Sequence, residues 1–112
     1  MPRMEKPVNK TTLIRRWGIQ NDNPTDDEMR SALGELDAID PEHPDCWLSD
    51  QSGWSITAFA SGLVTIENTE SGEGPWHMHG QSKDEILRLW KHLQQGNLAA
   101  IQTQNWIDGY NS

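Results

Sequence analysis

The amino-acid sequence predicts an α+β fold, with an antiparallel sheet of about four to five strands and two helices packed on one face. The first observation is the period-two alternation of apolar and polar residues within 47–68, which is typical of strands with one buried face. The second is a pair of helix-capping motifs, each followed by apolar residues at helical spacing. The third is the short, glycine-containing connections within 47–68, because short connections favour hairpins and therefore antiparallel pairing.

The chain length predicts one domain. At 112 residues the chain is close to the commonest domain size, so we expect residues 1–112 to fold as a single unit. Pro2 and Pro7 interrupt residues 1–10, which we expect to form a loose N-terminal arm. Residues 97–112 form a tail that we expect to pack back on the domain. Its apolar residues are Leu98, Ile101, Trp106, Ile107 and Tyr110.

The first strand is predicted over residues 11–19, with Leu13 and Trp17 among its core contacts. A cluster of Asn, Asp and Pro predicts a turn at residues 21–24. Two prolines and four acids predict an irregular loop at residues 37–45, between the first helix and the central strands.

A three-stranded antiparallel meander is predicted in the centre of the chain. Its strands are expected at residues 47–48, 54–59 and 63–68. The second connection contains Gly62, where we expect a positive φ. A short last strand is expected at residues 76–79, and its alternation would place His77 and His79 together on one face.

Two helices are predicted from their capping boxes. Residues 26–36 are expected to form the first helix, because Thr25 and Glu28 can each satisfy the backbone amide of the other. The second helix is expected to begin after Ser82, which is paired in the same way with Glu85. The apolar stripes are Met29, Ala32, Leu33 and Leu36 in the first helix, and Ile86, Leu89, Trp90 and Leu93 in the second.

The formal charge of −8 is unevenly distributed along the chain. Residues 22–50 contain ten Asp or Glu and one basic residue, Arg30, whereas residues 1–17 contain five Lys or Arg. An acidic block repels nucleic acid and attracts basic proteins. The charge pattern therefore argues against direct nucleic-acid binding and predicts a protein partner with a basic surface.

The sequence contains no long apolar run, so we predict no signal peptide and no membrane association. Cys46 is the single cysteine, which excludes an intramolecular disulfide and suits a reducing compartment. These observations predict a cytoplasmic location.

His77 and His79 have the only metal-like spacing, and His43 and Cys46 could in principle add ligands. No third ligand is fixed by the spacing, so we favour a structural or surface role and predict no metal and no cofactor. A small metal-dependent enzyme that uses His77 and His79 stays open as an alternative. Cys46 is expected to be a buried inert thiol, and we predict no catalytic residue.

Three blocks of the sequence carry a family resemblance. They are Asn23-Pro24 with the helix that ends Ala32-Leu33-Gly34-Glu35-Leu36-Asp37; Pro44-Asp45-Cys46-Trp47-Leu48 through Gly53-Trp54 to Ser61-Gly62-Leu63-Val64-Thr65-Ile66-Glu67-Asn68; and Leu87-Arg88-Leu89-Trp90 with Gly96 and Trp106 to Gly109-Tyr110. Across residues 23–110 the chain resembles small immunity proteins of the Imm1-like family. Bacteria encode these proteins beside toxins of polymorphic toxin and contact-dependent inhibition systems.

The resemblance implies an intracellular, non-catalytic protein that binds one cognate toxin and blocks its active site or another essential surface. Interface residues in such a family vary with the toxin, so the expected contacts come from the charge pattern. They are Asp26, Asp27, Glu35, Asp37, Asp40, Glu42 and Asp45, followed by Glu70, Glu73 and Trp76. The alternative is an acidic protein-interaction module or a nucleic-acid-mimic inhibitor of a nuclease.

Overall fold

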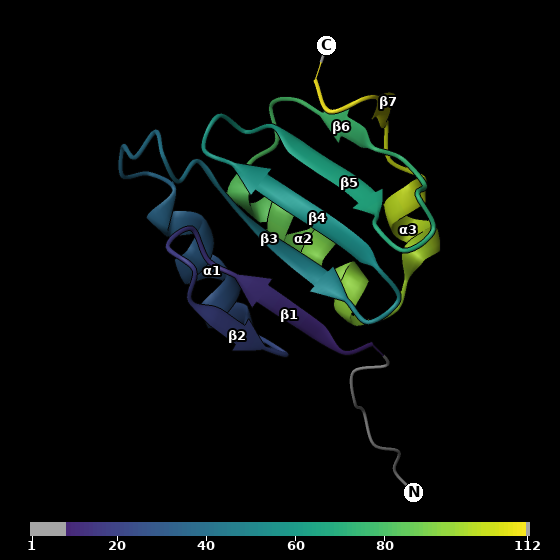
Figure 1. Ribbon diagram of the computed structural model, residues 1–112, viewed down its shortest axis with the longest axis horizontal. Helices are drawn as coiled ribbons and strands as arrows, with labels where there is room; N and C mark the ends of the chain where they lie inside the picture. Colours follow the sequence, from purple (N-terminus) through teal and green to yellow (C-terminus); the bar gives the residue numbers. More distant parts are fainter. Residues whose placement is uncertain (1–8, 112) are drawn as a thin grey trace, which may run out of the picture.

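Figure 1 shows the computed structural model, which describes residues 9–111 of the chain. Seven strands and three helices lie within these residues. In chain order they are β1 (Thr11–Ile14), β2 (Gln20–Asp22), α1 (Asp26–Glu35), β3 (Asp45–Asp50), β4 (Trp54–Phe59), β5 (Val64–Asn68), β6 (Trp76–Met78), α2 (Lys83–Gln94), α3 (Leu98–Gln102) and β7 (Ile107–Asp108). Of the predicted N-terminal arm, residues 1–8 lie outside the described part of the chain.

The strands form one antiparallel sheet in the order β2-β1-β3-β4-β5-β6-β7. The predicted antiparallel α+β class is confirmed, but the predicted numbers of four to five strands and two helices are too small. The added elements are short, since β2 has three residues, β7 two and α3 five. Each contains fewer than two periods of its own pattern, so no periodicity marks it in the sequence.

The predicted first strand over residues 11–19 is wrong in its second half. β1 ends at Ile14, and the chain turns back into β2 through Gly18, whose φ is 91°. Glycine adopts a positive φ without steric cost, so Gly18 is the local signal for this turn. Trp17 lies in the turn with half of its surface exposed and is not a core contact. The first half of the predicted turn at residues 21–24 belongs to β2.

The central meander is confirmed, and its first strand is longer than predicted. β3 begins at Asp45, which the sequence pattern assigned to a loop, and ends at Asp50. The turn between β4 and β5 contains Gly62 at a φ of 91°, as expected. Ile56 pairs with β3 on one side and β5 on the other, so β4 is central among the three.

Both predicted helices begin at their capping boxes. In α1 the Thr25 hydroxyl accepts from the amide of Glu28, and the Glu28 carboxylate accepts from the amide of Thr25. Ser82 and Glu85 make the same pair of bonds at the start of α2. α2 is fixed to the sheet by Trp90, which is fully buried and donates from Nε1 to the Ile56 carbonyl at 3.0 Å.

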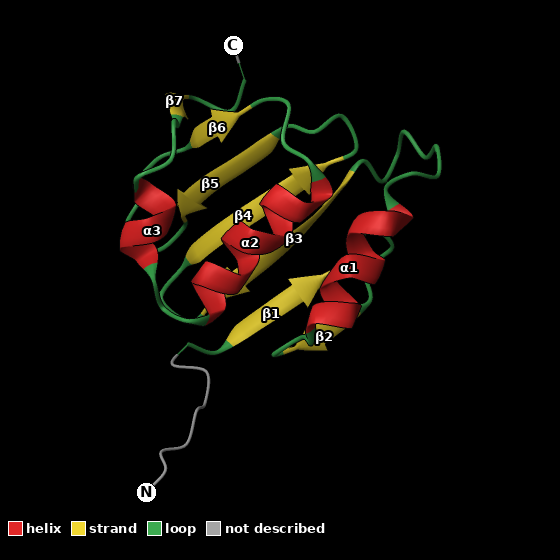
Figure 2. Cartoon of the chain, turned by 180° about the vertical axis from the view of Figure 1, so that it is seen from behind, coloured by secondary structure: helices red, strands yellow, loops and turns green. Residues whose placement is uncertain are grey.

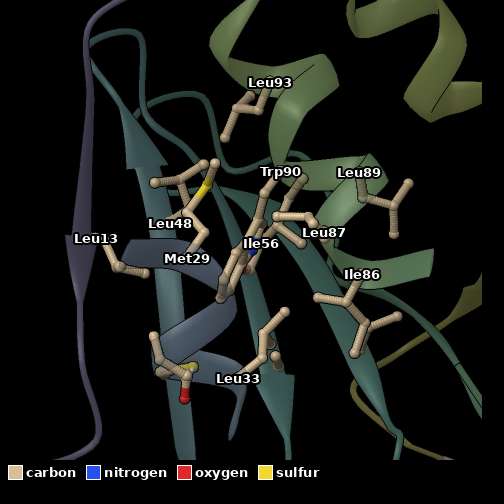
Figure 3. Packing of buried hydrophobic residues seen from close by; sticks show 14 of the residues in the cluster. Leu13, Met29, Leu33, Leu48, Ile56, Ile86, Leu87, Leu89, Trp90 and Leu93 are labelled. Carbon is tan, nitrogen blue, oxygen red and sulfur yellow. Dashed lines mark hydrogen bonds between the residues drawn. The ribbon is translucent and has the colours of Figure 1, made fainter. Parts of the chain in front are cut away.

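α1 and α2 cover one face of the sheet, which Figure 2 views from the helical side. The hydrophobic core lies between these two layers (Figure 3). Its fully buried residues include Leu13, Met29, Leu48, Ile56 and Trp90. Successive strand residues point to opposite faces of a sheet, so the residues between the core positions point away from the helices. No helix of residues 9–111 covers that second face, which lies toward the viewer in Figure 1.

Candidate protein-binding surface

The uncovered side of the sheet carries a continuous row of cross-strand neighbours. Ile14 pairs with Trp47, and Trp47 pairs with Thr57. Phe59 lies on the same side opposite Asp45. We call the outward side chains of β1, β3 and β4 the open sheet face. They are Thr12, Ile14, Asp45, Trp47, Ser49, Ser55, Thr57 and Phe59, all partly exposed.

The tail covers the other end of this side of the sheet. His77 points outward from β6 but is fully buried, and its Nδ1 lies 2.7 Å from the carbonyl oxygen of Gly109. Tyr110 donates its hydroxyl to Glu67 on β5 at 2.6 Å. This hydrogen bond, together with partial desolvation and the charge of Glu67, raises the pKa of Tyr110. The tail therefore shields β5 and β6, while β1, β3 and β4 stay accessible.

The sheet is acidic and lacks compensating bases. None of the seven strands described contains Lys or Arg, and together they contain Asp22, Asp45, Asp50, Glu67 and Asp108. The helices carry four bases, Arg30, Lys83, Arg88 and Lys91, alongside six acids. Arg30 of α1 and the α2 residues Asp84, Arg88 and Lys91 line a groove of about 450 Å³ between the helices. The sheet therefore differs from the helical layer in its lack of bases and not in the sign of its charge.

Asp45 is the only acid among the outward side chains of the open sheet face, and it lies at one end of that face. It is the first residue of β3, is half-buried, and lies opposite Phe59 across the strand pair. Burial raises the pKa of its carboxyl group. A partly desolvated carboxylate without a strong internal cation gains more from an external cation than a fully hydrated one does.

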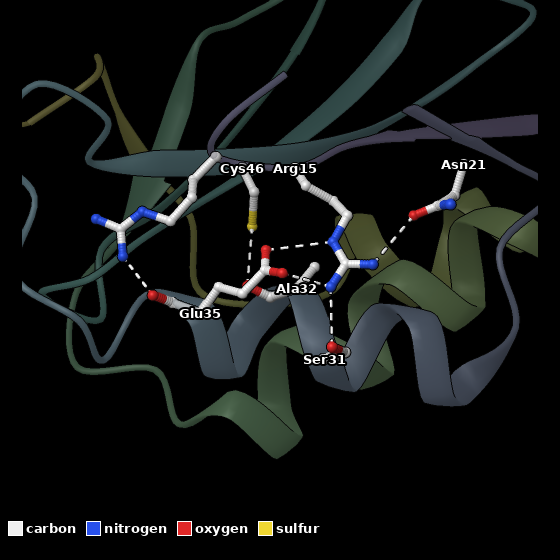
Figure 4. A network of polar contacts seen from close by, with 7 residues as sticks. Arg15, Asn21, Ser31, Ala32, Glu35 and Cys46 are labelled. Carbon is white, nitrogen blue, oxygen red and sulfur yellow. Dashed lines mark hydrogen bonds and ion pairs between the residues drawn. The ribbon is translucent and has the colours of Figure 1, made fainter. Parts of the chain in front are cut away.

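Three of the acids predicted to bind a partner are held by internal ion pairs. Glu35 accepts from Arg15 through both carboxylate oxygens, at 3.2 Å and 2.5 Å (Figure 4). The other two pairs join the antiparallel helices or their ends: Asp26 with Lys91 at 2.9 Å, and Asp37 with Lys83 at 2.7 Å. Asp27 is almost fully exposed, with Arg30 at 3.8 Å.

The loop at residues 37–44 is fixed by Arg16, a role that the sequence did not reveal. The Arg16 side chain is buried and donates to four backbone carbonyls, those of Glu35, Ala38, Asp40 and His43. The Asp40 carboxylate accepts from Trp17 Nε1 at 2.7 Å and lies 3.1 Å from His43 Nδ1. The hydrogen bond from Trp17 is the main cause of the lowered pKa of Asp40. Glu42 extends from this ordered loop and is exposed.

The second group of predicted contacts lies at the opposite corner of the sheet. Glu70 and Glu73 occupy the loop that follows β5, whereas the 37–44 loop precedes β3. β3 and β5 are parallel to each other because both are antiparallel to β4, so the end of one and the start of the other lie at opposite ends of the sheet. Trp76 points to the helical side, since it pairs with the core residue Ile66. The ten predicted residues therefore do not form one surface, since Asp26 and Asp27 lie at the start of α1, at the far end of that helix from Glu35 and the 37–44 loop.

Within residues 9–111, the fold brings no further metal ligand to His77 and His79 and no general base to Cys46. The rings of His77 and His79 lie edge to face, with 5.1 Å between their centroids. Cys46 is on the helical side of β3, which is separated from β6 by the two strands β4 and β5, and its thiol faces the carbonyl of Ala32. Burial, with smaller effects of nearby carboxylates, raises the pKa of this thiol to about 12, so it stays protonated at neutral pH. Among residues 9–111, no group of three or more His, Cys, Asp or Glu could hold a metal ion.

Comparisons with protein-family models, curated proteins and solved structures found no match to this chain. Within the described part of the chain, no helix combines the length and the apolar character needed to cross a membrane. The candidate site is an uncovered sheet surface that presents aromatic side chains beside carboxylates. Ile14, Trp47 and Phe59 are not among the site residues that the sequence predicts, because alternation alone does not say which face of a sheet is covered.

Proposed function

We propose that this chain is a non-catalytic immunity protein that binds a basic bacterial toxin in the cytoplasm and neutralises it by occluding its active or functional surface. The observation that carries the proposal is the open sheet face, which presents Trp47 and Phe59 next to Asp45 on strands that contain acids and no bases. Aromatic anchors inside a charged margin are the usual composition of a protein-binding hot spot. The resemblance to immunity proteins supplies the class of partner.

The size of the open sheet face indicates which neighbouring residues take part. Three strands of four to six residues cover about 15 by 17 Å by ordinary strand geometry. A standard interface buries about 800 Å² on each partner, so the contact extends beyond these strands. The adjoining surface is the 37–44 loop, which Arg16 holds in place and which carries Asp40 and Glu42. A loop that is already ordered loses little conformational entropy when it binds.

The paired acids contribute less to such an interface than the unpaired ones. Asp26, Glu35 and Asp37 already have internal cations, which a partner would have to displace or share. Among residues 9–111, Asp45 and Glu42 have no such cation; Asp45 is on the open sheet face, and Glu42 is in the loop that leads into β3. We therefore assign Asp45 and Glu42 the main electrostatic role, with Trp47 and Phe59 as the anchors that slow dissociation.

The second candidate function is inhibition of a nuclease by mimicry of nucleic acid. The outward carboxylates Asp22, Asp45 and Glu67, on strands that lack Lys and Arg, favour it, because they present negative charge without a base on the same strands. Both functions use the same surface and a basic partner. They differ in the number of partners, since a mimic binds several unrelated nucleases and an immunity protein binds one cognate toxin.

The test is capture of partners from the organism that encodes this chain, followed by measurement of affinity with the purified partner. The wild-type chain, Trp47→Ser and Asp84→Lys serve as matched baits, because Asp84 is an exposed residue of the helical layer. We expect one protein with a basic toxin domain at a ratio near 1:1, retained by Asp84→Lys and lost by Trp47→Ser. Recovery of many unrelated nucleases would favour mimicry. Equal retention by all three baits would contradict the assigned surface.

A further inference from the structure

A second site lies on the helical side of the sheet, away from the open sheet face. It is a pocket of about 330 Å³ at the ends of β4 to β7, beside α3. Three tryptophans line it, Trp54, Trp76 and Trp106, together with the carboxylate-bearing residue Asp108. Its volume is within the range of pockets that hold small molecules. This pocket is not part of the surface that we assign to toxin binding.

The fold holds the tryptophans of this pocket in place. Trp106 donates from Nε1 to the carbonyl of Ile101 at 2.8 Å. Trp54 is buried, and its backbone amide donates to Asp50 at 2.9 Å. A Cβ atom at Gly74 would lie 3.0 Å from the Trp76 ring, so the backbone of the β5–β6 loop packs directly against that indole. The pocket is therefore formed before any ligand arrives.

The charged side chains that we identify at and near the pocket are negative. Within residues 9–111 no Lys or Arg lines it, and its other polar lining consists of the neutral side chains Gln102 and Gln104. Asp108 is exposed at the edge strand β7. Glu73 precedes Gly74 in the loop that packs against Trp76 and is also exposed. An aromatic lining with carboxylates close by attracts a cation through the ring quadrupole and through charge, and tryptophan is the strongest of the aromatic partners.

We infer that this pocket binds a small quaternary ammonium solute, with its alkylated head group among Trp54, Trp76 and Trp106 and its charge facing Asp108. A quaternary ammonium group suits such a lining better than a primary amine. Its methyl groups contact the aromatic surface, and it has no N–H donors whose hydration would be lost among the tryptophans. The inference is independent of toxin binding, because it uses the opposite side of the sheet.

The test is a titration of the full chain followed through the indole N–H resonances of its six tryptophans. The probe is choline, and the matched control is 3,3-dimethyl-1-butanol, which has the same shape and no charge. Sodium chloride at equal ionic strength controls for salt. We expect choline to shift the resonances of Trp54, Trp76 and Trp106 and to bind about tenfold more tightly than the neutral isostere. Equal binding of the isostere, or shifts no larger than those caused by salt, would overturn the inference.

Two variants localise the binding. Asp108→Asn removes the charge at an exposed position and should weaken choline binding about threefold to tenfold while leaving the isostere unaffected. Trp76→Phe keeps an aromatic ring and should weaken binding less than Trp76→Ala does. Trp17→Ala, on the exposed turn between β1 and β2, should leave binding unchanged. If Asp108→Asn folds as the wild type does and binds choline equally well, the assigned charge contact is wrong.

Discussion

Arg16 is the single residue on which the 37–44 loop most depends. It is buried, and its guanidinium satisfies four backbone carbonyls that span the end of α1 and the loop. A planar group with five donors suits this role, whereas a lysine ammonium can satisfy fewer of these acceptors in fixed geometry. The loop beside the open sheet face therefore takes its shape from a residue about twenty positions earlier in the chain.

We predict that Arg16→Met lowers the free energy of unfolding by about 3 kcal/mol, because several buried carbonyls lose their donor at once. Denaturant unfolding measures the loss. Arg15→Met is the matched control, since Arg15 carries the same charge but binds the partly exposed side chain of Glu35 and no backbone carbonyl among residues 9–111. Its loss should be smaller, and a loss from Arg16→Met no larger than that from Arg15→Met would contradict the role assigned to Arg16.

Asp45 has the opposite effect on stability. Burial raises the pKa of its carboxyl in the folded state, so the folded protein binds this proton more tightly than the unfolded chain does. The stability associated with Asp45 is therefore present below the unfolded-state value of 3.8 and is lost as the pH rises through the higher folded-state pKa. At neutral pH, ionisation of Asp45 therefore lowers the free energy of unfolding.

Asp45→Asn should therefore be more stable than the wild type at neutral pH, and the difference should shrink as the pH falls below about 4. Urea unfolding across this pH range measures both results. The same variant should bind the partner more weakly. That result would show that the Asp45 carboxylate lowers stability but contributes to binding. A variant that is less stable at neutral pH would show that Asp45 is instead stabilised by its surroundings.

Among the structural elements, the two helices depend on their capping boxes. Ser82→Ala should lower the free energy of unfolding by about 1 kcal/mol, because the amide of Glu85 loses its acceptor. Ser82→Asp restores a good acceptor at the same position and should recover most of the loss, as measured by thermal or denaturant unfolding. Equal losses in the two variants would mean that the Ser82 side chain has another role.

The elements differ in how far the sequence could predict them. The capping boxes and apolar stripes of α1 and α2 are local patterns, so they were predicted almost to the residue. β7 is defined only by its pairing with β6, which no local pattern records.

Long-range contacts also limit what the sequence predicts about the site. Asp26 was correctly identified as part of an acidic helix face, but its partner Lys91 is 65 residues away and appears only in the folded chain.

At the scale of the whole molecule, acids outnumber bases on both layers. The described strands contain five acids and no Lys or Arg, while the helices contain six acids together with Arg30, Lys83, Arg88 and Lys91. A basic partner is therefore attracted to the molecule as a whole, and the strands contain no base that would repel it at the sheet. Steering of this kind acts on the association rate and is weakened by salt.

We predict that Glu42→Lys combined with Asp45→Lys lowers the association rate with the captured partner about tenfold and flattens its dependence on salt. Stopped-flow mixing at several ionic strengths measures both effects. The control is Glu73→Lys, which reverses the charge of one residue at the opposite corner of the sheet. If this control slows association as strongly, the interface is at that corner and not at the open sheet face.

The most direct test of the account is hydroxyl-radical labelling of the chain, free and in complex with its captured partner. Trp47 and Phe59 report on the open sheet face, and Trp76 and Trp106 on the opposite side serve as internal references. The account predicts that labelling of Trp47 and Phe59 falls in the complex while labelling of Trp76 and Trp106 stays unchanged. Protection of Trp76 and Trp106 with Trp47 and Phe59 still reactive would contradict it.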